Sequence, residues 1–95
     1  MVEEVKKIQL LEIIKSITKK EENIGLISIF ELVKEVEKLL HLSLSDCHKV
    51  IIELENENRI YLESINDITR LSQEQKFTAI NDSVRGFLYY VGVID

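Results

Sequence analysis

Residues 44–62, LSDCHKVIIELENENRIYL, join a helix-like pattern directly to a strand-like one. In the first part apolar side chains recur every three or four positions, which is the spacing of one helix face. They are Leu44, Cys47, Val50, Ile51 and Leu54. Further along, Ile60 and Leu62 alternate with side chains of the opposite face, as in a strand. Asn58 lies between the two patterns and tolerates the left-handed conformation in which helices end. The stretch therefore predicts a helix to about residue 57 and a strand over 59–63.

Serine residues mark the starts of this helix and of the one before it. Ser43 and Asp46 have the three-residue spacing of an N-terminal capping pair, and Ser45 is a competing cap. Ser28 and Glu31 repeat the spacing, and the helix that follows them runs to the break HLSLSD. Its apolar face consists of Ile29, Leu32, Val33, Val36, Leu39 and Leu40. Two consecutive helices separated by a tight turn are therefore predicted.

A further helix is predicted over residues 2–20. One arc of it is apolar and comprises Val2, Leu10, Leu11, Ile13, Ile14 and Ile17. Val5 and Ile8 fall outside that arc, among charged residues. Either the core extends around the first turns, or these two side chains contact a second subunit in a homodimer. The pattern leaves both alternatives open.

The C-terminal part ends in residues 86–94, GFLYYVGVI, which are rich in aromatic and β-branched side chains and predict a strand. Both faces of this strand are apolar, which indicates that both are covered. Ser72 and Gln75 have capping-box spacing and predict a short helix, with turns at INDITR before it and at NDSVRG after it. Pairing 86–94 with 59–63 predicts a hairpin with a long tip of about 22 residues, a length at which an ordered element is expected.

The length, composition and net charge of the chain fit one soluble domain over residues 1–95. The chain is 45% hydrophobic and 31% charged, with a net charge of −5. It has no apolar run of about 18 residues and no signal peptide, so we expect no membrane segment and a cytoplasmic location. The one cysteine, Cys47, cannot form an internal disulfide. His41 and His48 lie near it without the repeated spacing of metal ligands, which favours a buried thiol and no metal or cofactor.

Catalytic patterns are missing from the sequence. It contains no glycine-rich phosphate loop, paired-carboxylate motif or nucleophile motif. Ser45, Asp46 and His48 fall within one helical turn, where capping explains the first two. We therefore expect a binding protein rather than an enzyme.

The predicted order of elements is helix, short strand, helix, tight turn, helix, strand, long connection, strand. This order resembles the winged-helix (winged helix-turn-helix) domain, and SLSDCHKVIIELENENRIYL is similar to that family's third helix and first wing strand. Asn58 stands where many members of the family have glycine. The resemblance implies an α+β fold: a three-helix bundle with a helix-turn-helix and a C-terminal β-hairpin wing with a long tip.

Winged-helix domains often bind double-stranded DNA, and the resemblance implies a DNA-binding protein, for example a transcriptional regulator. The third helix would then face the major groove, through Ser45, His48, Lys49, Ile52 and Asn56. Cations of the wing would contact phosphates, and the candidates are Arg59, Arg70, Lys76 and Arg85.

Other members of the family bind proteins, and the acidic charge favours this alternative because an acidic domain repels nucleic acid unless its cations cluster. The basic excess lies in residues 1–20, whereas the third helix is acidic overall. Ile52 is central on the outward arc of that helix, where an apolar side chain suits a protein contact, with Val5 and Ile8 as further contacts. A third alternative rotates the helix and places Ile52 in the core.

Overall fold

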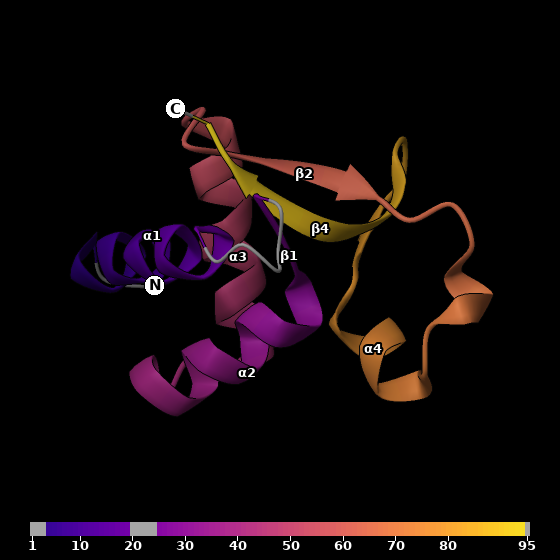
Figure 1. Cartoon of the computed structure of the whole chain (residues 1–95), viewed down its shortest axis with the longest axis horizontal. Helices are drawn as coiled ribbons and strands as arrows, with labels where there is room; N and C mark the ends of the chain where they lie inside the picture. Colours follow the sequence, from indigo (N-terminus) through magenta and orange to yellow (C-terminus); the bar gives the residue numbers. More distant parts are fainter. Residues whose placement is uncertain (1–3, 20–24, 95) are drawn as a thin grey trace.

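Four α-helices and a small antiparallel sheet form the described part of the chain, residues 4–19 and 25–94, in this computed structural model (Figure 1). The helices are α1 (Glu4–Thr18), α2 (Ile29–Leu40), α3 (Leu44–Asn56) and α4 (Gln73–Thr78). The strands are β1 (Leu26–Ser28), β2 (Ile60–Ser64), β3 (Ile80–Asp82) and β4 (Gly86–Val93), and a short 3-10 helix spans Ile68–Arg70. The predicted α+β class is confirmed. None of the helices in this part is long and apolar enough to cross a membrane.

The helix ends lie where short-range hydrogen bonding predicts them. The Ser28 hydroxyl accepts a bond from the Glu31 backbone N–H at 3.2 Å, and Ser43 accepts one from Asp46 at 3.1 Å. Such caps satisfy N–H groups that the first turn of a helix leaves without partners. Asn58, with a φ of 60°, adopts the left-handed conformation after α3. The chain can therefore leave α3 and enter β2 within three residues.

The core lies between the three long helices and one face of the sheet. Leu10, Leu11 and Ile14 supply the inner side of α1. Val5 and Ile8 are 61% and 53% exposed, so the alternative in which the core extends around the first turns of α1 is wrong. Residues 2, 3 and 20 of the predicted helix lie outside the described residues.

Strand β4 is the centre of the sheet. The predicted pairing with β2 is confirmed, and it runs from Ile60 opposite Val93 to Ser64 opposite Leu88. The other edge of β4 pairs with β1 near its C-terminal end and with β3 near its N-terminal end. Since β1 and β3 share that edge, β2 is the outer strand on its side of the sheet (Figure 1).

A bulge interrupts the regular alternation of β4. Glu63 is opposite Tyr90, whereas the next residue, Ser64, is opposite Leu88, so Tyr89 is an extra residue on β4. An extra residue shifts the side chains that follow it to the other face of the sheet. Leu88 and Tyr89 are consequently both buried, 1% and 3% exposed. The expectation that both faces of this strand are covered is wrong toward its ends, because Phe87 and Ile94 are 39% and 45% exposed.

The connection between β2 and β4 is ordered rather than an extended tip. The predicted short helix is present as α4, with the complete capping box of Ser72 and Gln75. This helix returns to lie beside α2 (Figure 1). The predicted turn at residues 81–86 is too long, because Ile80–Asp82 form β3 and only residues 83–85 turn.

Candidate functional site: the outer face of α3 and the hairpin turn

The outward side of α3 carries Ser45, Lys49, Ile52 and Asn56, and all four side chains are exposed. We refer to these four residues as the α3 stripe. The opposite side of the helix is buried and consists of Cys47, Val50, Ile51 and Leu54. Ile52 is 41% exposed and its neighbour Ile51 is 0% exposed. The predicted orientation of the helix is therefore confirmed, and the rotated alternative with Ile52 in the core is wrong.

His48 lies on the flank of α3, apart from the α3 stripe. Its Nε2 is 2.8 Å from the carbonyl oxygen of Thr78, the last residue of α4. A carbonyl oxygen only accepts hydrogen bonds, so Nε2 carries the proton and donates it. The half-buried imidazole thereby attaches α4 to α3, and this nitrogen is not directed toward a ligand on the outer face.

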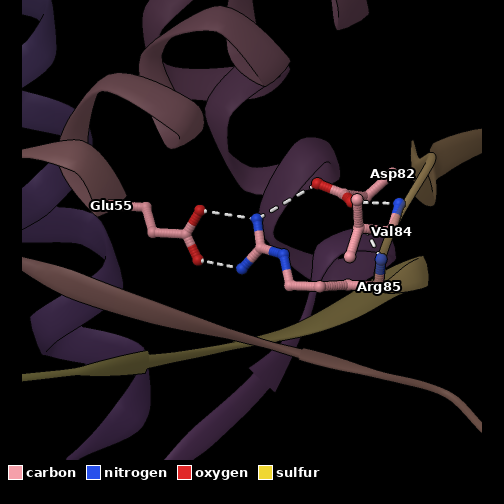
Figure 2. Close-up of polar contacts among 4 residues, drawn as sticks. All are labelled: Glu55, Asp82, Val84 and Arg85. Carbon is pink, nitrogen blue, oxygen red and sulfur yellow. Dashed lines mark hydrogen bonds and ion pairs between the residues drawn. The ribbon is translucent and has the colours of Figure 1, made fainter.

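Arg85, in the turn between β3 and β4, is bound to α3 (Figure 2). Its guanidinium nitrogens lie 2.6 and 2.9 Å from the two carboxylate oxygens of Glu55, which is a bidentate ion pair. One of these nitrogens is also 3.3 Å from Asp82. The contact with Glu55 raises the pKa of Arg85, so the guanidinium remains charged. The carboxylates of Glu55 and Asp82 therefore offset the positive charge of Arg85, the side chain that was predicted to contact a phosphate.

Asp82 holds the shape of the same turn. Its Oδ1 accepts hydrogen bonds from the backbone N–H groups of Val84 and Arg85, at 2.8 and 2.9 Å. The backbone hydrogen bond from Arg85, and after it the one from Val84, lowers the pKa of the Asp82 carboxyl because each favours its charged form. The turn is thus folded by Asp82 and attached to α3 by Arg85.

The other predicted phosphate contacts are dispersed. Arg70 and Lys76 lie on the connection that returns toward α2, and Arg70 is 3.9 Å from Asp67. Lys7 of α1, a cation outside the predicted set, pairs with Glu57 just after α3, at 2.6 Å. Arg59 is exposed and has no ion pair within the described residues. Across α3 and the adjoining hairpin turn of the described chain, no continuous basic stripe is present.

The metal alternative has no support in the geometry. Within residues 4–19 and 25–94, no three His, Cys, Asp or Glu side chains are grouped so as to hold a metal ion. Cys47 is 1% exposed, as predicted for a buried thiol. Burial raises its pKa to about 12, because the apolar surroundings disfavour the thiolate.

Cys47 is consequently expected to resist alkylation in the folded protein. At pH 8 the native thiolate fraction is on the order of a thousandfold below that of an unfolded cysteine with a pKa of about 8.5. Iodoacetamide labelling, followed by mass spectrometry with and without urea, measures the difference. Equal labelling rates in both states would contradict the buried position of Cys47.

Several exposed aromatic or aliphatic side chains, Phe77, Val84 and Phe87 among them, lie outside the site residues predicted from the sequence. Phe77, Val84 and Phe87 are 77%, 90% and 39% exposed. Phe77 lines a cavity of about 550 Å³ between α2 and α4, together with Phe30, Val33 and Leu44. Val84 adjoins Arg85 in the turn between β3 and β4. The sequence carries no signal for these positions, since their exposure depends on how the connection folds.

Comparisons of this chain with protein-family models, with curated proteins and with solved structures gave no match.

Proposed function

We propose that the chain is a winged-helix domain that binds another protein through the α3 stripe. The fold assignment is supported by the order α1, β1, α2, α3, β2, β4 and by the sheet order β1-β4-β2. The binding assignment is supported chiefly by one observation: Ile52 is exposed at the centre of a surface that lacks a basic stripe.

The charges around Ile52 suit a protein better than a phosphate backbone. Lys49 and Arg85 are the cations of this surface, and Glu53, Glu55 and Asp82 are its carboxylates. Nucleic-acid affinity depends on cations that neutralise phosphates, and here the carboxylates outnumber them. An exposed isoleucine beside a net negative charge fits a partner protein that presents an apolar side chain with basic neighbours.

The proposal predicts that Ile52→Asp abolishes partner binding without unfolding the domain. A tagged wild-type chain, purified from its native cells after mild crosslinking, is expected to retain a partner protein that the Ile52→Asp variant loses. Leu39→Asp is the matched control, because Leu39 is 57% exposed on α2, outside the α3 stripe, and the substitution likewise replaces an exposed aliphatic side chain by aspartate. The same dependence is expected when the purified partner is recombined with each variant. Loss of the partner in Leu39→Asp but not in Ile52→Asp would contradict the proposed surface.

DNA binding is the second candidate, and it rests on the polar members of the α3 stripe. Ser45, Lys49 and Asn56 are exposed hydrogen-bond donors on one side of α3, and Arg59 immediately precedes β2. This function predicts that random-sequence duplex DNA binds at low salt, that affinity falls steeply as salt rises, and that Lys49→Glu abolishes binding. If DNA binding behaves in this way and Ile52→Asp still retains the partner protein, DNA binding would replace protein binding as the proposed function.

A further inference from the structure

Strand β2 has an open edge. Ile94 N–H donates to the Arg59 carbonyl at 3.1 Å, so this carbonyl points toward β4, whereas the Arg59 N–H donates to the Leu54 carbonyl at 2.9 Å. Backbone groups of an antiparallel strand point alternately to its two sides. Ile60, Leu62 and Ser64 therefore direct their N–H and C=O groups away from β4. No strand of the described chain pairs with this side of β2.

The side chains of β2 leave the edge accessible. Ile60 and Leu62 point into the core and are 0% and 9% exposed. On the other face, the Tyr61 ring lies across Gly92 of β4, so closely that a Cβ on Gly92 would be 2.2 Å from it. The ring is thus directed over its own sheet rather than over the open edge. Exposed backbone donors and acceptors of this kind are a template for another strand.

The charges that flank the edge are opposite and symmetrically placed. Arg59 and Glu63 lie on the same face of β2, two residues on either side of Tyr61. Both are exposed, and neither has an ion pair within the described residues. An antiparallel copy of the strand, related by a two-fold axis at Tyr61, would place Arg59 of each copy opposite Glu63 of the other.

We propose that two copies of this chain associate through the β2 edges in that register. Ile60 of each copy would lie opposite Leu62 of the other and exchange backbone hydrogen bonds with it. The Arg59–Glu63 pairs would then be the non-hydrogen-bonded pairs, whose side chains lie closer together. One two-fold contact of this kind joins the two sheets.

The register is specific. A parallel arrangement in register would bring Arg59 next to Arg59 and Glu63 next to Glu63. A shift of two residues either way in the antiparallel arrangement places Tyr61 opposite Glu63 or Arg59, and no opposite-charge pair remains in direct register. Natural edge strands carry charges that discourage pairing. Arg59 and Glu63 therefore favour association in the unshifted antiparallel register, and neither in the parallel arrangement nor in the shifted ones. This match between the two charges is why a second copy of the chain is the expected occupant of the edge.

Charge exchange tests the proposal on the full chain. In sedimentation velocity over a concentration series to about 1 mM, the wild type is expected to dimerise reversibly and weakly, as a small interface implies. Arg59→Glu or Glu63→Arg alone places like charges opposite each other twice, and each is expected to weaken the dimer at least about tenfold. The double variant Arg59→Glu, Glu63→Arg restores both pairs and is expected to recover the dimer.

Two controls separate this contact from others. Glu74→Arg makes the same charge change at an exposed position on α4 and is expected to leave the dimer unchanged. Val5→Asp with Ile8→Asp tests the contact through α1 that the sequence suggests. Circular dichroism confirms that each variant is folded. A wild type that stays monomeric, a dimer lost only through the α1 substitutions, or a folded double variant that does not recover association would each overturn the proposal.

Discussion

Ile51→Asp is expected to unfold the domain, whereas Ile52→Asp, one position along the same helix, is expected to leave it folded. Ile51 is 0% exposed, so the substitution removes a buried side chain and places a carboxylate in the core. Removing the apolar side chain alone costs about 2–5 kcal/mol, and an unpaired buried charge adds to that. The sum is comparable to the total stability of a small domain, about 5–15 kcal/mol.

Ile52 differs from Ile51 only in the direction of its side chain. It is 41% exposed, so an aspartate at this position stays in water. We expect a change in the free energy of unfolding within about 1 kcal/mol, mostly from the lower helix propensity of aspartate. Urea denaturation followed by circular dichroism measures both variants. If Ile52→Asp unfolded the domain as readily as Ile51→Asp, the α3 stripe would not be a free surface, and the proposed protein contact would lose its central residue.

Gly92→Val is the second substitution with a large expected effect. Gly92 is in β4 opposite Tyr61, and its backbone has no positive φ, so glycine is required there for space rather than for conformation. A Cβ at this position would be 2.2 Å from the nearest atom of the Tyr61 ring. The ring would have to leave the sheet surface or the strands would have to separate. We expect a loss of about 1–3 kcal/mol in the free energy of unfolding, as for other overpacked sites.

A double-mutant cycle identifies the cause of that loss. In a Tyr61→Ala background the ring is absent, and Gly92→Val is expected to be nearly neutral, because valine suits a strand. Thermal unfolding of the wild type, both single variants and the double variant gives the coupling. An equal loss with and without the tyrosine ring would show that the requirement for glycine has another origin.

The local features of the fold were predictable because they depend on residues three or four positions apart. Ser28, Ser43 and Ser72 each accept a hydrogen bond from a backbone N–H three residues further along. Asn58 ends α3 through its own backbone conformation. The buried face of α3 follows from helical periodicity, and the pairing of β2 with β4 follows from two matching strand patterns. In each case the partners lie close together in the chain or are indicated by composition.

The site was predicted only in part, because its polar contacts join distant residues. The α3 stripe follows from the helix orientation. His48 and Arg85 were expected on the outer surface as donors, yet each makes a hydrogen bond 30 positions away. Nothing within a few residues of either indicates these partners, since they depend on where the connection from β2 to β4 places α4 and the hairpin turn.

The sequence by itself determined the α+β class, the limits of α2 and α3, and the inward and outward sides of α3. Helical periodicity and capping are local, so a single chain segment carries the information. Only the tertiary structure decided that Arg85 is bound to Glu55, that Tyr89 is buried by a bulge, and that the outer edge of β2 is open. These depend on strand register and on contacts across the fold, where a shift of one residue changes which side chains meet.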